Sequence, residues 1–143
     1  MADQVRELAM AFTFFFRDRE TLELIAEHVF SPIGREGTLR IWDAGCATGE
    51  EPYSIAIVFA ERFGFEELDR LSIDATDIDE SGRGDFGEII RKGVYSRRHL
   101  DGIPATYKDK YFRPNDDGSQ YEVDCRIKSR VCFQRHDLLS LVP

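Results

Sequence analysis

One stretch of the chain constrains its fold more than any other, because an apolar segment runs into a glycine turn and then into a helix. The segment TLRIWDAG (38–45) is typical of a strand, and the turn that follows it ends at Gly49. Pro52 suits the first turn of a helix, and Gly64 suits the residue after its end. A second apolar segment, LSIDATDID (71–79), predicts another strand. We therefore expect two parallel strands joined by a helix in a right-handed crossover, within an α/β fold.

The remainder of the chain carries weaker patterns. The segment 18–30 has one apolar stripe at helical spacing with Asp18 as a candidate N-cap, and 31–37 is typical of a loop. A short helical stretch and a basic patch lie between 80 and 99. In the last part of the chain we expect a helix at 105–112 and an antiparallel hairpin whose strands lie on both sides of 115–119. A further sheet strand is expected at 130–137.

Composition excludes several classes of protein. The formal net charge is −8, so there is no basic excess to displace counterions, and we expect no nucleic-acid partner. The three cysteines lack the spacing of a zinc site, so we expect reduced thiols and no metal. The longest apolar run, LAMAFTFFF (8–16), is too short to span a bilayer and has no signal-peptide features. We therefore expect no membrane insertion and a cytoplasmic location.

Two glycine clusters could mark a nucleotide site. A formal GxGxxG occupies 82–87, but the dinucleotide fingerprint belongs at the turn after the first strand, and this one follows the second. We interpret it as a chance pattern, which makes a nicotinamide-dependent oxidoreductase the least favoured function. The other cluster, Gly45 and Gly49, lies directly after the first strand, where ligands bind in open α/β sheets.

Asp77 lies at the end of the second strand. The carboxyl ends of parallel strands meet at one edge of a sheet, so Asp77 is expected to face the same crevice as the glycine turn. A carboxylate in that place can accept hydrogen bonds from both hydroxyls of a ribose. The alternative is that Asp77 and Asp79 only cap the turn that follows them.

Glu50 and Glu51 argue against a phosphate ligand. One pair of like charges about 4 Å apart costs roughly 4 kcal/mol at an effective dielectric constant of about 20. S-adenosylmethionine has a ribose and a base but carries a sulfonium and an ammonium in place of phosphates, so it would be attracted, as would the ammonium of its product S-adenosylhomocysteine. The alternative is that both glutamates only occupy the first turn of the helix, where the helix dipole favours them.

The chain resembles the CheR-type chemotaxis receptor methyltransferase family along nearly its whole length. The resemblance rests on motifs that occur in the family's order and spacing: TFFFRD (13–18), RIWDAGCATGEEPYSIA (40–56), ATDID (75–79), GVYS (93–96), YF (111–112) and VCFQRHDLL (131–139). It implies a partial Rossmann-like S-adenosylmethionine-dependent methyltransferase fold with a small antiparallel β insertion. It also implies methylation of glutamate side chains on the cytoplasmic domains of chemoreceptors, as a protein-glutamate O-methyltransferase.

The resemblance also implies a cofactor site, carried over by position: Thr13, Arg17, Gly45, Gly49, Glu50, Glu51, Asp77, Asp137 and Leu138. Thr13 and Arg17 would reach the cofactor from the linker ahead of the first helix, with Arg17 placed for the methionine carboxylate. The turn glycines would allow close backbone approach, and one of the two glutamates would meet the cationic end. Asp77 would hold the ribose, and the pair after the last strand would meet the adenine edge.

We expect one methyltransferase-like domain over 1–143. It would comprise an N-terminal linker and helix (1–36), the cofactor unit (37–80) and the antiparallel subdomain (about 107–130). Relative to the family's pattern, we expect the sequence to lack the N-terminal helical domain and the part of the catalytic domain that would follow Pro143. Replacement of the missing part by homo-oligomerisation stays open as an alternative.

The chemistry of the family makes small demands on side chains. A glutamate carboxylate is already ionised at neutral pH, so methyl transfer to it needs no general base. Arg35, Arg97 and Arg98 are candidates by location only for orienting the incoming carboxylate, and we assign no catalytic residue. The main alternative function is a non-catalytic module that holds S-adenosylmethionine or S-adenosylhomocysteine, or that serves only as an interaction surface.

Overall fold

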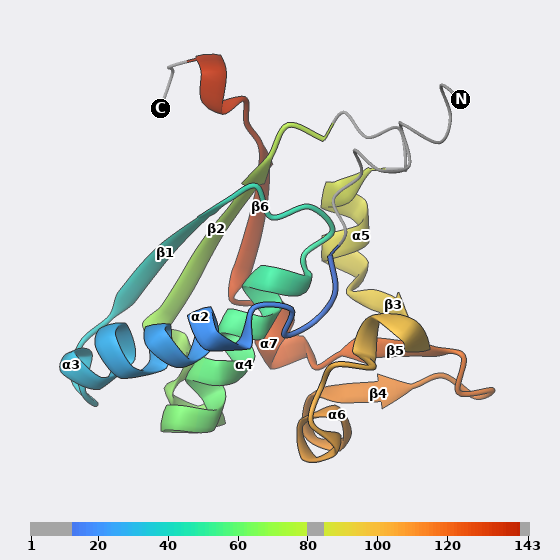
Figure 1. The fold of residues 1–143 in the computed structure, drawn as a ribbon, viewed down its shortest axis with the longest axis horizontal. Helices are drawn as coiled ribbons and strands as arrows, with labels where there is room; N and C mark the ends of the chain where they lie inside the picture. The colour runs from blue at the N-terminus through green and yellow to red at the C-terminus, as the bar shows by residue number, and fades with distance from the viewer. Residues whose placement is uncertain (1–12, 80–84, 141–143) are drawn as a thin grey trace.

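The computed structural model describes residues 13–79 and 85–140, which form two three-stranded sheets (Figure 1). The first sheet contains β1 (Leu39–Ala44), β2 (Leu71–Asp77) and β6 (Val131–Arg135) in the order β1-β2-β6. Neighbouring strands in this sheet run parallel to each other. The predicted strand–helix–strand unit and the α/β class are therefore confirmed.

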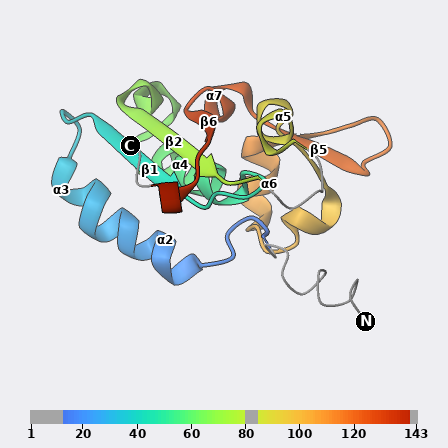
Figure 2. The same ribbon diagram turned by 90° about the horizontal axis from the view of Figure 1, so that it is seen from above.

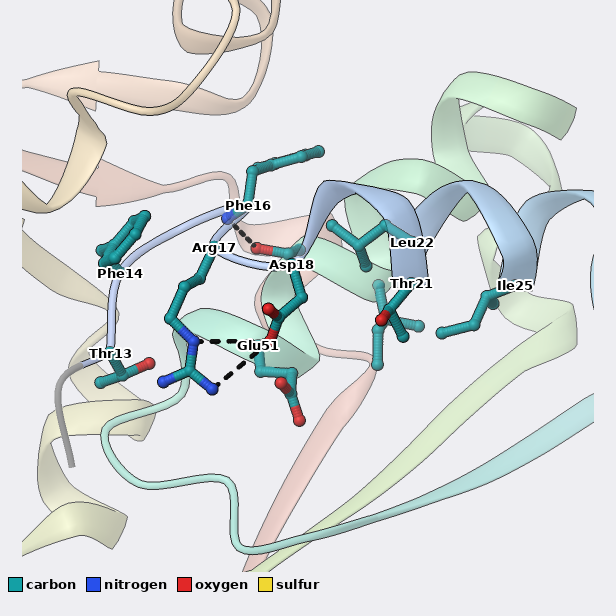
Figure 3. Close-up of a pocket in the computed structure, with 11 residues that line it drawn as sticks. Thr13, Phe14, Phe16, Arg17, Asp18, Thr21, Leu22, Ile25 and Glu51 are labelled. Carbon is teal, nitrogen blue, oxygen red and sulfur yellow. Dashed lines mark hydrogen bonds and ion pairs between the residues drawn. The ribbon is translucent and has the colours of Figure 1, made fainter.

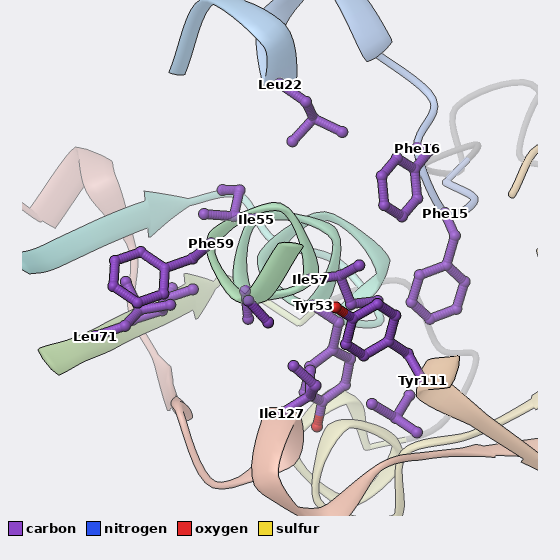
Figure 4. Packing of buried hydrophobic residues seen from close by; sticks show 14 of the residues in the cluster. Phe15, Phe16, Leu22, Tyr53, Ile55, Ile57, Phe59, Leu71, Tyr111 and Ile127 are labelled. Carbon is purple, nitrogen blue, oxygen red and sulfur yellow. The ribbon is translucent and has the colours of Figure 1, made fainter. Parts of the chain in front are cut away.

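The helix that connects β1 to β2 is the centre of the molecule. This helix, α4 (Glu50–Phe63), begins after Gly49 and ends before Gly64, as the sequence predicts. Ten of its fourteen residues are buried, so its solvent-exposed face is narrower than that of an ordinary amphipathic surface helix. Figure 4 shows buried side chains from the parallel sheet, the N-terminal segment and the small subdomain surrounding this helix.

The helical segment ahead of β1 extends further than predicted. It consists of α2 (Arg19–Ile25), a π-helical turn η1 (Ala26–Phe30) and α3 (Ser31–Ile33), so the first residues of the expected loop are helical. Pro32 has no N–H to donate to the preceding turn, and a widened turn before it accommodates its ring. Figure 2 shows α2 and α3 running along one side of the molecule.

Asp18 occupies the N-cap position of α2 without acting as a cap. Its side chain makes no capping hydrogen bond, and instead its Oδ2 lies 3.4 Å from the guanidinium of Arg17. The expected capping contact is therefore wrong, although the position is right.

The second sheet contains β3 (Val94–Ser96), β5 (Gln120–Val123) and β4 (Phe112–Pro114), all antiparallel in the order β3-β5-β4. The hairpin predicted around 115–119 forms β4 and β5. The third strand of this sheet, β3, precedes the 107–130 range that we expected for the antiparallel subdomain. The remaining helices are α5 (Phe86–Lys92), α6 (Ala105–Tyr111) and α7 (Cys125–Lys128), with 3-10 turns at Phe65–Arg70, Arg97–Leu100 (η3) and Leu138–Ser140 (η4).

The first half of the glycine pattern at 82–87 falls outside the described residues. Only its last part is described: Asp85 accepts a hydrogen bond from the backbone N–H of Glu88 and so begins α5, in which Gly87 lies. This places Gly87 in a helix after the second strand rather than at the first crossover.

One hydrophobic cluster spans both sheets. Phe15 is fully buried and makes edge-to-face contacts with Tyr95 and Phe112, at centroid distances of 4.9 and 5.0 Å. Both partners belong to the small antiparallel sheet, so the N-terminal segment is packed between that sheet and α4. The antiparallel subdomain and the parallel sheet therefore share a core.

The other face of the parallel sheet is open in the part of the chain that the structure describes. Trp42 is 60% exposed there, and Arg40 lies 2.6 Å from Asp74 across the same face. The three cysteines are unpaired: Cys46 is buried, while Cys125 and Cys132 are exposed. Among the described helices, none combines the length and the apolar character needed to cross a bilayer.

Candidate functional site

The loop between β1 and α4 folds over the carboxyl end of β2. The backbone N–H groups of Gly45 and Cys46 both donate to the carbonyl oxygen of Thr76, at 2.7 and 3.0 Å. Gly45 has a φ of +92°, and a Cβ added there would meet no atom within 4 Å other than those of its chain neighbours. Its backbone therefore leaves room for a ligand, and the predicted approach of a cofactor to it stays a prediction. The loop is fixed by hydrogen bonds on one side and accessible on the other.

Gly49 has a different reason to be glycine. Its φ is +98°, and a Cβ there would lie 2.7 Å from Cγ1 of Ile90 and 3.0 Å from Oη of Tyr95. The close approach at this position is therefore between α4 and the α5–β3 segment. The predicted approach of a cofactor to Gly49 stays a prediction.

Asp77 faces the glycine loop and holds it. Its Oδ2 accepts a 2.9 Å hydrogen bond from the backbone N–H of Ala47, and its Oδ1 accepts one of 3.1 Å from Asp79. Both interpretations of this carboxylate thus have support, because it lies at the expected crevice and also caps the turn after β2. Each carboxylate oxygen can accept more than one hydrogen bond, so these contacts leave capacity for ribose hydroxyls.

Three carboxyl groups converge at the carboxyl end of the sheet. Asp43 at the end of β1 is only 6% exposed, and Glu51 of α4 and Asp77 of β2 lie close to it. Burial, followed by the charges of these two neighbours, raises the pKa of Asp43 to about 7. Sequence reasoning missed Asp43, although it stands two residues before Gly45. We call Asp43, Glu51 and Asp77 the acidic cluster.

The two neighbouring glutamates point in different directions. The Glu50 side chain is completely buried, with Oε2 accepting from Oγ1 of Thr48 at 2.6 Å and Oε1 lying 2.8 Å from Nδ1 of His99. Direct contact of Glu50 with a ligand would require this pair to open. Glu51 is exposed and belongs to the acidic cluster, so of the two it is better placed to meet a cation. Sequence reasoning missed His99, which lies far along the chain.

The small antiparallel sheet also reaches the loop. Oη of Tyr95 in β3 donates a 2.7 Å hydrogen bond to the carbonyl oxygen of Thr48. The same residue is buried, and burial and the Glu50 charge raise its pKa well above the ordinary value, so it remains a hydrogen-bond donor.

The N-terminal linker covers the start of α4. The backbone N–H of Phe16 donates to Oγ of Ser54 at 3.0 Å, and that hydroxyl donates to the carbonyl oxygen of Glu50 at 2.6 Å. This brings Thr13, Arg17 and Glu51 to one pocket of about 100 Å³ (Figure 3). Three of the predicted site residues from two distant segments are therefore together.

Asp137 and Leu138 lie at the same edge as Asp77. The N–H of the preceding residue, His136, donates to the carbonyl oxygen of Asp77 at 2.9 Å. Asp137 accepts from the backbone N–H of Leu139 at 2.8 Å, and Leu138 is 51% exposed. The expected adenine pair is thus next to the expected ribose residue.

The arginines considered for substrate orientation are scattered. Arg35 precedes β1 and therefore lies at the amino end of the parallel sheet, opposite the glycine loop. Arg97 and Arg98 are exposed in η3, which follows β3. Arg35 is thus removed from the site, and the other two stay candidates by location.

These placements define what the crevice can bind. Its floor is the glycine loop, its lining is the acidic cluster, and its side is the pocket with Arg17. A pyrophosphate would meet like charge at the acidic cluster, whereas a ligand with a cationic end would be attracted and could place a carboxylate at Arg17. The buried Asp43 oxygen Oδ2, which has no hydrogen-bond partner among the described residues, fits a cationic donor.

Comparison with known proteins is consistent with this geometry. The family model described as "CheR methyltransferase, SAM binding domain" matches residues 11–143. Chemotaxis protein methyltransferase 2 of Pseudomonas aeruginosa is 38% identical over 76% of this chain and 37% of its own length. The protein of the same name in Vibrio cholerae is 33% identical over 94% of this chain and 46% of its own length. An uncharacterized 104.1 kDa protein of Rhodobacter capsulatus is 34% identical over all of this chain and 15% of its own length. The chain thus spans less than half the length of each of these three relatives.

Proposed function

Because the chain belongs to the CheR methyltransferase family, we propose that it serves in methyl transfer to glutamate side-chain carboxylates of chemotaxis receptors. The cofactor of this domain is S-adenosylmethionine. When bound, this cofactor supplies a methyl group activated by its attachment to a positively charged sulfur. The cytoplasmic domain of a chemoreceptor is the proposed protein partner, and the names of the relatives in Pseudomonas and Vibrio support a role in chemotaxis.

The observation that carries the proposal is the acidic cluster beside an open glycine loop. Two neighbouring strands and the helix between them each contribute one carboxyl group, and Gly45 presents backbone without a side chain at the same place. This charge pattern suits a nucleoside with a cationic tail and opposes a nucleoside with phosphates. A nicotinamide dinucleotide is therefore a poor ligand for this crevice.

The proposed roles follow from the positions. Arg17 would pair with the methionine carboxylate, and Thr13 would contact the cofactor from the same linker. Glu51 would face the cationic end, with Glu50 held behind it. Asp77 would accept from the ribose hydroxyls while it keeps the loop in place. The residues at the end of β6, Asp137 and Leu138, would border the adenine.

The proposed reaction needs positioning rather than acid–base catalysis. The incoming glutamate is already ionised, so no residue of the chain has to remove a proton from it. The rate would come from holding the carboxylate in line with the methyl group and from keeping water away from the two opposite charges. The apolar walls of the Arg17 pocket, which include Phe14 and Phe16, support such water exclusion.

The alternative is a module that binds the cofactor without turning it over. The same crevice would serve it, because nothing in cofactor recognition requires a substrate site. The two functions differ only in whether a methyl group leaves the bound cofactor.

Two measurements test the proposal in sequence. Calorimetric titration should give micromolar binding of S-adenosylhomocysteine and no heat from NAD or NADP; binding of a dinucleotide in its place would overturn the cofactor assignment. Incubation with radiolabelled S-adenosylmethionine and a receptor cytoplasmic fragment should then give base-labile label, as methyl esters do. Binding without transferred label would favour the non-catalytic module.

A further inference from the structure

The carboxyl group of Asp43 is buried, which is unusual for a group that is normally charged. It is 6% exposed at the end of β1, and its Oδ2 has no hydrogen-bond partner among the described residues. Burying an ionised carboxylate without a donor is costly, and structures normally avoid it by pairing the charge or by adding a proton. The buried Asp43 carboxyl group is therefore stabilised by either a bound proton or a neighbouring cation.

The groups that face Asp43 are mostly acids. Glu51 from α4 and Asp77 from β2 lie near it, and Cys46 from the glycine loop is a neutral thiol because burial raises its pKa. Arg17, a cation that lines the adjoining pocket, is 3.4 Å from Asp18. Among the described residues, no cation thus pairs directly with Asp43 in an ion pair.

The acidic surroundings of Asp43 are the informative feature. Two ionised carboxylates have only acceptors, so they repel, and neither can donate to the other. A proton on the buried Asp43 carboxyl group removes one negative charge from the acidic cluster and supplies a donor at the oxygen that has no hydrogen-bond partner among the described residues.

We propose that Asp43 holds a proton in the free protein and that the cationic end of the bound cofactor displaces this proton into solvent. The inference rests on the proposed cofactor site and deepens it. The O–H bond of the Asp43 carboxyl group breaks, the proton passes to water or buffer, and no other bond changes. The positive charge of the ligand then takes the place of the proton beside the acidic cluster.

Affinity consequently depends on pH. Below the titration range of Asp43 the ligand must displace a proton, so its affinity falls about tenfold for each pH unit; above that range the affinity is constant. The pKa of Asp43, raised to about 7 by burial and by its acidic neighbours, places the change near neutrality. The cofactor should therefore bind about tenfold more weakly near pH 6 than near pH 8.

The test is a titration of the whole chain with S-adenosylhomocysteine, whose ammonium stays charged over this range. The dissociation constant is measured from about pH 6 to pH 8.5, and the heat near pH 7 is measured in phosphate and in Tris, which differ in ionisation enthalpy. We expect the tenfold change and a buffer-dependent heat that corresponds to proton release. Binding that is equally tight at all pH values, with the same heat in both buffers, would overturn the inference and leave the proposed function standing.

Two variants locate the proton. Asp43→Asn should abolish the pH dependence and the proton release, because the amide at position 43 has no acidic proton to release. Asp74→Asn is the matched control on the next strand, since Asp74 pairs with Arg40 on the opposite, open face, and it should keep both. Persistence of the full pH dependence in Asp43→Asn would contradict the assignment. Failure of the unsubstituted chain to bind at any pH would instead overturn the proposed cofactor site itself.

Discussion

The carboxylate of Asp77, at the end of the second parallel strand, accepts a 2.9 Å hydrogen bond from the backbone N–H of Ala47 in the loop that follows the first strand. One residue therefore fixes the shape of the loop and, in the proposed function, also binds the ribose. Substitutions at this position should affect both loop stability and ribose binding, and the two effects can be measured separately.

Asp77→Ala should weaken S-adenosylhomocysteine binding by about 1–3 kcal/mol, because buried hydrogen bonds to the ribose and to the loop are both lost. Isothermal titration measures the affinity, and thermal unfolding measures the stability lost with the hydrogen bond to the loop. Asp77→Asn is the matched variant, since its amide oxygen can still accept from Ala47. Unchanged affinity in the alanine variant would refute the ribose assignment.

Asp43 should make the stability of the fold fall as pH rises. Its pKa in the folded chain is raised to about 7, whereas in the unfolded chain it is near 3.8. Between these values the folded state binds one more proton than the unfolded state, so each step up in pH favours unfolding. Asp43→Asn removes this term and should stabilise the fold by about 2–4 kcal/mol near pH 8, with little effect near pH 4. Urea unfolding at both pH values checks this, and an equal effect at the two would contradict it.

Gly49→Ala should destabilise the fold more than Gly45→Ala. Both positions have positive φ, so both substitutions carry a backbone cost of about 1 kcal/mol. Only at Gly49 does a Cβ also meet Ile90, at 2.7 Å, which should add about 1–3 kcal/mol of overpacking. Urea unfolding of the two variants gives the comparison directly. Gly45→Ala should instead reduce cofactor affinity, because it fills the open side of the loop.

His99→Ala should cost about 1–3 kcal/mol of stability, because it leaves the buried Glu50 carboxylate without one of its two partners. The double variant with Glu50→Gln should recover part of this loss, since a neutral amide is cheaper to bury. A double-mutant cycle followed by denaturant unfolding measures the coupling. Additive effects would mean that the 2.8 Å contact contributes nothing.

The sequence predicted the elements whose signals are local. The strand–turn–helix–strand order is encoded by the apolar segments, by Pro52 and by Gly64, and the structure has the same elements within one or two residues. The hairpin around 115–119 is predictable for the same reason, because turn residues lie between two apolar segments. Each of these signals needs only neighbouring residues.

The parts that were missed depend on packing between distant segments. Glu50 and Glu51 look alike in the sequence, but the Glu50 carboxylate is buried against Thr48 and against His99, which is 49 positions away. The burial of Asp43 likewise follows from the elements around it rather than from its neighbours in the chain. The extra turn at 31–33 also escaped prediction, because a π-helical turn lets a proline follow a helix that standard geometry would end there.

The hydroxyl of Tyr95 has a mechanical consequence. It joins a strand of the small antiparallel sheet to the carbonyl oxygen of Thr48, in the loop that borders the crevice. A force that displaces that strand must either move the loop with it or break a partly buried hydrogen bond. Displacement of the antiparallel subdomain and occupancy of the crevice are thus linked through this phenol.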